Sequence, residues 1–159
     1  MRRRTFQHNR HVRVQGLRRN LCPTHADFFL NELITWAETT YGASRNREDR
    51  AVFGLSNGAA FASWMGTNHP EIFGAAIVFS QGWEVDYEPP ADTLPVRFYL
   101  EAGTLEPDFQ SETNRWRQVL EEAGVEVSYH ERVAGHDSVQ WREEIGNALV
   151  WVFGTGDFG

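Results

Sequence analysis

The residues whose types and spacing could do chemistry centre on Ser56, which stands in a Gly-x-Ser-x-Gly pattern between Gly54 and Gly58. An apolar run at 51–55 precedes the pattern, and a segment with helical spacing follows it. This arrangement predicts a nucleophile elbow, a sharp strand-to-helix turn on which small flanking residues let the backbone fold tightly and the hydroxyl stands clear. The backbone amide of Asn57 would point to the space where an oxyanion forms.

A serine hydroxyl becomes a strong nucleophile when a histidine takes its proton and a carboxylate orients that histidine. Two later turns of the chain offer these groups. Glu106 follows an apolar segment at 96–101, and His136 follows a segment at 125–133. Asp108 lies in the same loop as Glu106 and is the second candidate for the acid. The sequence therefore indicates a serine, histidine and carboxylate set.

Five other histidines compete with His136 for the role of base. Of these, His130 lies inside an expected strand and His69 stands before Pro70 at an expected helix end, so both are better interpreted as structural residues. His136 instead lies in a loop directly before a helix, and its neighbour Asp137 is in position to cap that helix. The loop position favours His136.

Strand-like and helix-like segments alternate along the chain from residue 24. Such alternation predicts an α/β fold with a parallel sheet and helices on both faces, in which functional groups gather beyond the carboxyl ends of the strands. Ser56, Glu106 and His136 each follow an expected strand, so we expect the three to converge. The expected strands are 51–55, 74–80, 96–101 and 125–133, and the expected helices are 24–41, about 58–68, 107–123 and 138–153.

The composition is that of a globular protein, with 41% hydrophobic and 13% aromatic residues and a net charge of −7. All 15 basic residues are arginines, and seven of them lie in the first twenty positions, which contain no acidic residue. We interpret residues 1–22 as an Arg-rich irregular leader and residues 23–159 as the folded part. Binding of nucleic acid by this leader is the weaker interpretation, so we expect no nucleic-acid partner.

Other sequence features argue against membrane, disulfide and metal chemistry. No apolar run approaches the length of a membrane span, and no secretion signal follows the first arginines. Cys22 is the only cysteine, which excludes a disulfide within the chain and a cysteine-based zinc site. We therefore expect a cytoplasmic protein with no cofactor, no metal and no membrane partner.

Four separated motifs resemble the esterase branch of the α/β-hydrolases, which includes enterochelin esterases, feruloyl esterases and esterase D-like enzymes. The resemblance covers roughly residues 24–153. It implies that Ser56 is the nucleophile, Glu106 the carboxylate and His136 the base. It also implies that the segment 80–83, with Trp83, lines the substrate pocket. The motifs are Gly54-Leu55-Ser56-Asn57-Gly58, then His69 to Gly74 with Ser80, then Glu101 to Pro107, and finally Ala134-Gly135-His136-Asp137 with Trp141-Arg142.

The resemblance also shows what this chain lacks. The family fold has about four strands before the serine turn, whereas only some fifty residues precede Ser56. We therefore expect residues 23–159 to form a partial α/β-hydrolase domain, the carboxyl-terminal part, with about four strands. The strand at 51–55 would be a sheet edge, which favours a homo-oligomer.

One oxyanion donor in the family normally comes from those earlier strands, and losing one donor lowers turnover on the order of a hundredfold or more. The sequence thus predicts a serine esterase that acts on a small-molecule ester through an acyl-enzyme. The alternative is a truncated, catalytically impaired fragment with the same fold.

Overall fold

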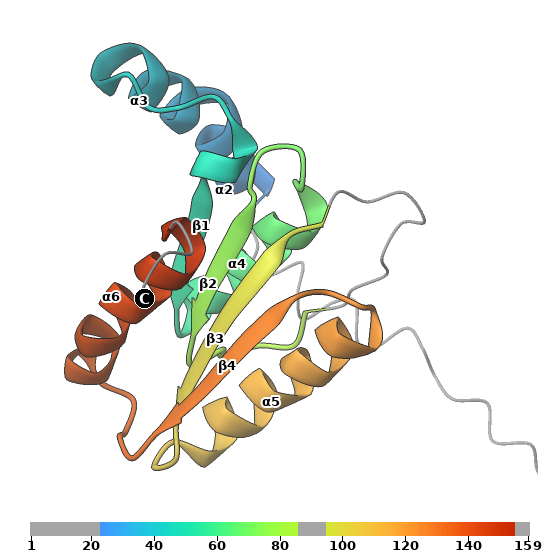
Figure 1. The fold of residues 1–159 in the computed structure, drawn as a ribbon, viewed down its shortest axis with the longest axis vertical. Coiled ribbons are helices and arrows are strands. Elements are labelled where there is room, and N and C mark those ends of the chain that lie inside the picture. Colours follow the sequence, from blue (N-terminus) through green and yellow to red (C-terminus); the bar gives the residue numbers. More distant parts are fainter. Residues whose placement is uncertain (1–22, 86–94, 155–159) are drawn as a thin grey trace, which may run out of the picture.

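The computed structural model describes residues 23–85 and 95–154. Its centre is a parallel sheet with the strand order β1-β2-β3-β4 (Figure 1). The parallel α/β sheet expected from the alternation of segments is therefore confirmed. The Arg-rich leader expected at 1–22 lies outside the described residues. The four strands are β1 (Ala51–Leu55), β2 (Ala75–Phe79), β3 (Arg97–Gly103) and β4 (Val127–Arg132).

The register of the sheet brings the carboxyl ends of all four strands to one edge. Leu55 of β1 pairs with Phe79 of β2, Phe79 pairs with Glu101 of β3, and Glu101 pairs with His130 of β4. All five residues of β2 are buried, as expected for a parallel strand that is covered on both faces. The loops that follow the strands are thus neighbours in space.

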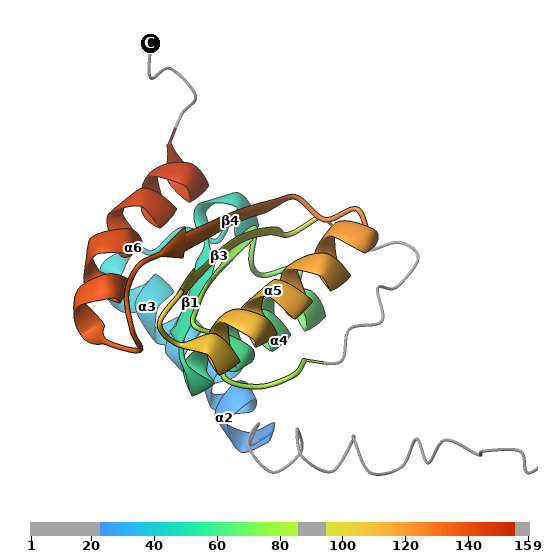
Figure 2. The ribbon, with the colours of Figure 1, turned by 90° about the horizontal axis from the view of Figure 1, so that it is seen from below.

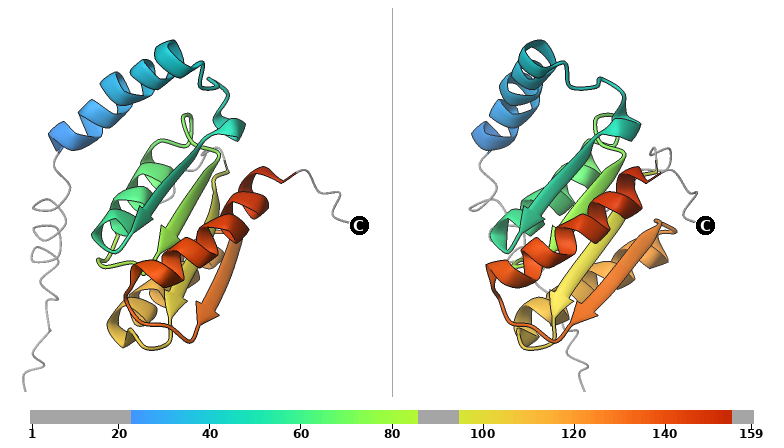
Figure 3. Two further views of the ribbon diagram at one scale, coloured as in Figure 1. Left: turned by 90° about the vertical axis from the view of Figure 1, so that its left-hand side faces the viewer. Right: turned by 60° about the vertical axis from the view of Figure 1, so that its left-hand side comes forward.

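Helices cover both faces of the sheet. The helices α4 (Asn57–Asn68) and α5 (Pro107–Glu122) lie on one face, and α6 (Ser138–Phe153) lies on the other (Figures 2 and 3). Small residues let α4 approach β2 closely, because a Cβ atom on Gly66 would lie only 2.9 Å from that of Ala76. Each of these three helices follows a strand in the chain, so each begins near the same edge of the sheet.

The first helical segment differs from the expected uninterrupted helix at 24–41. It consists of α2 (Pro23–Phe28), a π-helical turn η1 (Phe29–Leu33) and α3 (Ile34–Tyr41). Phe29 packs edge-on against Phe61 of α4 at 5.9 Å, whereas α3 buries no residue and extends away from the sheet (Figures 1 and 3). A short 3₁₀ turn, η2 (Arg47–Asp49), leads into β1. Among the described helices, none combines the length and the apolar character needed to cross a membrane.

Candidate active site

Ser56 occupies a sharp turn between the end of β1 and the start of α4. Its φ of 55° and ψ of −122° place it in a region that non-glycine residues rarely adopt. A Cβ atom on Gly54 would lie 1.9 Å from the Gly58 carbonyl oxygen, so the turn requires glycine at position 54. A Cβ atom on Gly58 itself would meet nothing within 4 Å. The tight turn expected from the pattern thus depends on the first glycine and not on the second.

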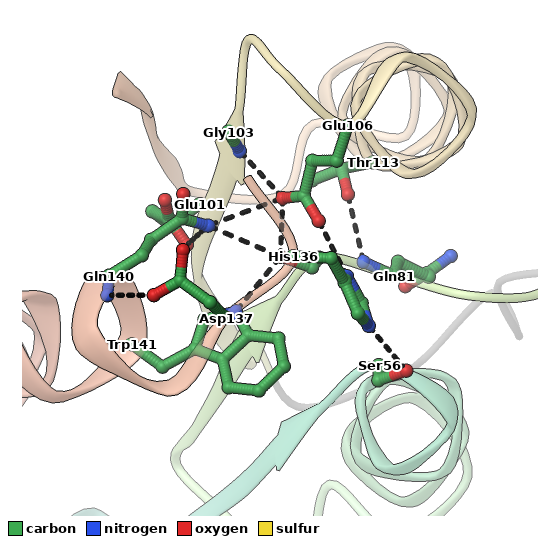
Figure 4. A network of polar contacts seen from close by, with 11 residues as sticks. Ser56, Gln81, Glu101, Gly103, Glu106, Thr113, His136, Asp137, Gln140 and Trp141 are labelled. Atoms are coloured by element: carbon green, nitrogen blue, oxygen red, sulfur yellow. Dashed lines mark hydrogen bonds and ion pairs between the residues drawn. The ribbon is translucent and has the colours of Figure 1, made fainter. Parts of the chain in front are cut away.

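The structure brings Ser56, His136 and Glu106 together at the carboxyl edge of the sheet (Figure 4). Ser56 Oγ lies 2.9 Å from His136 Nε2, and His136 Nδ1 lies 2.5 Å from Glu106 Oε2. With the imidazole proton on Nδ1, the ring donates to the carboxylate and accepts from the serine hydroxyl. The geometry therefore permits a proton to pass from the hydroxyl to the ring.

The Glu106 side chain is held by several donors. It precedes α5, and only 5% of the residue is exposed. Its Oε1 accepts hydrogen bonds from Ser80 Oγ at 2.6 Å, from the Gly103 amide at 2.7 Å and from Gln140 Nε2 at 3.2 Å. These contacts leave Oε2 for His136. The carboxylate is consequently fixed in one orientation toward the imidazole.

Two aromatic side chains confine the His136 ring. Phe109 stacks on one face, with ring centroids 3.9 Å apart and planes inclined by 23°. Trp141 approaches at 4.9 Å with its ring nearly perpendicular to the imidazole. An aromatic face attracts a cation, so Phe109 lies where it would stabilise the imidazolium that forms when His136 accepts a proton.

Glu106, and not Asp108, is the acid beside His136. Asp108 is exposed on the first turn of α5.

Asp137 caps α6, since its Oδ1 accepts from the Val139 amide at 2.8 Å and from the Gln140 amide at 3.2 Å. The capping role that the sequence suggested for Asp137 is confirmed.

The competing histidines within the described residues lie elsewhere. The ring of His130 stacks on that of Tyr99 at 4.7 Å, and its Nε2 lies 2.8 Å from Ser128 Oγ. His69 follows α4 and contacts Glu71 at 3.2 Å. Both have local structural partners, as expected.

Asn57 and Trp83 lie together beside the serine turn. Asn57 is the first residue of α4, where a helix leaves its amide without an intrahelical partner. Trp83 Nε1 donates to Asn57 Oδ1 at 2.5 Å, and 48% of Trp83 is exposed. Trp83 is therefore accessible next to Ser56.

Ser80 and Gln81, in the same segment 80–83, do not line a substrate pocket as the resemblance implied. Ser80 and Gln81 are both fully buried. Ser80 turns inward to Glu106, while Gln81 is held between two helices by Ser63 Oγ at 2.7 Å and Thr113 Oγ1 at 3.0 Å. The expectation was wrong for these two residues, because the Ser80 hydroxyl and the Gln81 Oε1 and backbone amide have their partners in the protein interior.

A second buried carboxyl group, that of Glu101, lies near Glu106. Gln140 Nε2 donates to Glu101 Oε2 at 3.2 Å as well as to Glu106 (Figure 4). Burial, followed by the negative charges of Glu106 and Glu144, raises the pKa of Glu101 to about 8. Glu101 and Gln140 have no role among the sequence-based predictions, and Ser80 was expected only to line the substrate pocket. Ser80 could have been found, because it follows β2 just as the other three site residues follow their strands.

Within residues 23–85 and 95–154, no group of three or more His, Cys, Asp or Glu side chains is placed to hold a metal ion. A serine, a histidine and a carboxylate in this arrangement can support nucleophilic catalysis assisted by proton transfer.

A protein-family model described as "Putative esterase" matches residues 4–152. Among solved structures, the chain is similar to a ferulic acid esterase, with 21% identity, a TM-score of 0.70, and coverage of 80% of this chain and 60% of that one. It is also similar to enterochelin esterase from Shigella flexneri, with 22% identity, a TM-score of 0.69 and coverage of 80% and 37%. For S-formylglutathione hydrolase from Staphylococcus aureus the identity is 17%, the TM-score 0.71 and the coverage 82% and 61%.

These similarities show the α/β-hydrolase fold. The chain spans between 37% and 61% of the lengths of these three proteins. A search of curated proteins gave no match.

Proposed function

Because this chain belongs to the esterase family whose model matches residues 4–152, we propose that it is a serine hydrolase of small-molecule carboxylic esters. Ser56 is the nucleophile, His136 the general base and Glu106 the carboxylate that orients the base. The observation that carries the proposal is the unbroken line of hydrogen bonds from Ser56 through His136 to Glu106, with distances of 2.9 and 2.5 Å.

The first half of the reaction transfers the acyl group to the enzyme. Ser56 Oγ attacks the ester carbonyl carbon while its proton moves to His136 Nε2, and a tetrahedral oxyanion forms. The Glu106 carboxylate, buried against His136, stabilises the imidazolium. When the carbon–oxygen bond of the ester breaks, His136 gives its proton to the departing alcohol, and the acyl group remains on Ser56.

The second half releases the acid. A water molecule takes the place of the alcohol, gives its proton to His136 and attacks the acyl carbon. Collapse of the second tetrahedral intermediate returns the proton to Ser56 Oγ. The amide of Asn57 donates to both oxyanions, and Trp83 contacts the bound ester, because it is exposed and fixed to the Asn57 side chain.

Impaired turnover on the same scaffold is the second proposal. The amide of Asn57 is the one oxyanion donor that we assign among the described residues. A site that lacks one such donor typically turns over on the order of a hundredfold to a thousandfold more slowly. Under this proposal Ser56 still reacts, but its catalytic cycle is slow.

Ester hydrolysis by the purified chain tests the first proposal. The panel contains a p-nitrophenyl ester of a short acid, a feruloyl ester and S-formylglutathione, and we expect Ser56→Ala to abolish hydrolysis. The matched control is Ser128→Ala, because Ser128 also forms a Ser–His hydrogen bond, with His130 at 2.8 Å, but lies away from Glu106. Hydrolysis that survives in Ser56→Ala would contradict the proposal.

Labelling with a fluorophosphonate separates the two proposals. The reagent forms a phosphorus–oxygen bond with the activated serine as fluoride leaves, so it reports the nucleophile independently of turnover. Labelling of Ser56 together with rapid ester turnover supports the esterase. Labelling of Ser56 together with ester turnover that is about a hundredfold or more slower than that of a site with both oxyanion donors supports the impaired site. Absence of labelling in the folded chain contradicts both.

A further inference from the structure

Ser80 is held in a conformation that serine adopts only under constraint. It follows β2 directly, is fully buried and has a φ of 52°. Among the described non-glycine residues, Ser56 alone shares a positive φ. Such a backbone conformation persists only where surrounding contacts hold it, and it is concentrated at functional sites. One of those contacts is the Ser80 amide, which donates to the Glu101 carbonyl oxygen at 2.8 Å.

The neighbours of Ser80 fix the direction of its hydroxyl proton. Trp141 Nε1 lies 2.9 Å from Ser80 Oγ, and Ser80 Oγ lies 2.6 Å from Glu106 Oε1. An indole N–H group can only donate, and an ionised carboxylate can only accept. Ser80 must therefore accept from Trp141 and donate to Glu106. The short distance to Glu106 is typical of a hydroxyl that donates to a charged oxygen.

Trp141 thus contacts His136 directly and is linked to Glu106 through Ser80. Its indole nitrogen polarises the hydroxyl that holds Glu106, and its ring packs perpendicular to His136 at 4.9 Å. We propose that Ser80 and Trp141 are positioning residues, which lock Oε1 of Glu106 so that Oε2 alone faces the imidazole. This inference rests on the proposed function of Ser56, His136 and Glu106.

The proposal predicts which kinetic constant changes. Ser80 is fully buried, so it cannot touch a substrate. Its loss should leave binding intact and should lower the rate at which His136 accepts the serine proton. A hydrogen bond to a charged group corresponds to a roughly tenfold to hundredfold change in rate. We therefore expect a fall in kcat of that size with little change in KM.

Three variants and one matched control test the proposal with the full chain. Ser80→Ala removes the hydroxyl. Ser80→Gly also removes it and, in addition, relieves the backbone strain of the positive φ, so both variants should lower kcat. Trp141→Phe keeps a ring beside His136 but removes the N–H group, and should give a smaller, several-fold loss. The control is Ser63→Ala, which deletes a buried hydroxyl that donates to Gln81 Oε1 at 2.7 Å. It should lose stability but keep its kcat.

A second readout does not depend on turnover. The proton on His136 Nδ1, hydrogen-bonded to Glu106, should give a low-field proton resonance that disappears in His136→Gln. We expect this resonance to shift in Ser80→Ala and in Trp141→Phe, and to stay in place in Ser63→Ala. A shift that occurs although the wild type shows no Ser56-dependent hydrolysis would support the positioning role while the proposed function fails.

The positioning role is overturned by either of two results. The first is Ser56-dependent hydrolysis in which Ser80→Ala and Ser80→Gly keep kcat within about twofold of the wild type, far below the loss expected for a charged hydrogen bond. The second is an equal loss of kcat in Ser63→Ala, because this would show that any deleted buried hydroxyl has the same effect.

Discussion

At the scale of single residues, Glu101 is a carboxyl group for which the fold provides little polar compensation. It is fully buried, and within the described residues its Oε1 has no hydrogen-bond partner. Glu106 accepts hydrogen bonds from Ser80, Gly103, Gln140 and His136. Ionising two neighbouring buried carboxyl groups at once is electrostatically unfavourable. The hydrogen-bond donors that stabilise a negative charge surround Glu106. Glu101 is consequently the one that keeps its proton at neutral pH.

This difference makes stability depend on pH in a defined direction. Burial, together with the charges of Glu106 and Glu144, raises the pKa of Glu101 from its ordinary 4.5 to about 8. Between these two values the native state binds more protons than the unfolded chain. The free energy of unfolding should therefore fall as pH rises from about 4.5 to about 8, by up to about 1.4 kcal/mol per pH unit.

The variant Glu101→Gln should lack this slope, because an amide does not titrate. The measurement is urea unfolding of both proteins at pH values from about 5 to about 9, roughly one unit apart. It gives the difference between their free energies of unfolding at each pH. We expect the wild type to lose stability relative to the variant as pH rises. A difference that is constant over this range would show that Glu101 does not hold a proton in the native state.

The sequence was sufficient to predict Ser56, His136 and Glu106, with Asp108 as the second candidate for the acid, but not the side chains packed behind Glu106. Ser56, Glu106 and His136 each follow a strand, and parallel strands end at one edge, so their convergence could be expected. Ser80 satisfies the same rule but was assigned to the substrate pocket. The direction in which its side chain turns depends on Glu106 and Trp141, which are distant in sequence. Local patterns carry no information on that direction.

At the scale of elements, the turn between β1 and α4 makes unequal demands on its two glycines. A Cβ atom at position 54 would collide with the Gly58 carbonyl oxygen at 1.9 Å, whereas one at position 58 would meet nothing within 4 Å. We expect Gly54→Ala to destabilise the fold by about several kcal/mol, because the new Cβ atom would collide with a backbone carbonyl group that cannot move aside easily. Gly58→Ala should be neutral or stabilising by up to about 1 kcal/mol, since alanine is the better helix former.

Thermal unfolding of the two variants, with fluorophosphonate labelling of Ser56, measures both effects. Gly54→Ala should unfold at a lower temperature and lose labelling, and Gly58→Ala should retain both properties. Equal tolerance of the two substitutions would contradict the close approach seen at this turn.

The elements were predicted best where local signals are strong. The last helix was expected at 138–153 and is found at Ser138–Phe153, because Asp137 caps its start. Strand β3 extends to Gly103, two residues beyond the expected end at 101. Pairing of Ala102 and Gly103 with Glu131 and Arg132 of β4 continues the ladder there. The π turn at Phe29–Leu33 was missed, because one extra residue in a turn hardly alters apolar spacing.

At the scale of the whole molecule, β1 forms one edge of the described sheet. Within the described residues it pairs only with β2, and its Phe53 is 47% exposed. An exposed edge with an apolar side chain favours pairing with another chain. We therefore expect the purified protein to self-associate through β1, and Phe53→Lys to reduce this association.

Sedimentation analysis over a range of concentrations tests this expectation. Val150→Lys is the matched control, because Val150 is a similarly exposed apolar residue, at 54%, that lies on α6 and not on a strand. We expect the control to associate like the wild type and Phe53→Lys to sediment as a smaller species. A wild type that remains monomeric throughout would contradict self-association through β1.

The contact between Ser56 and His136 joins residues 80 positions apart in the chain, and this separation matters during synthesis. A ribosome that adds roughly 5 to 20 residues per second delivers the serine several seconds before the histidine. Over that interval the nascent polypeptide carries an unreactive hydroxyl. Under the proposed mechanism, Ser56 becomes reactive only when the loop that carries His136 joins the sheet, so a nascent chain without that loop would not react with esters.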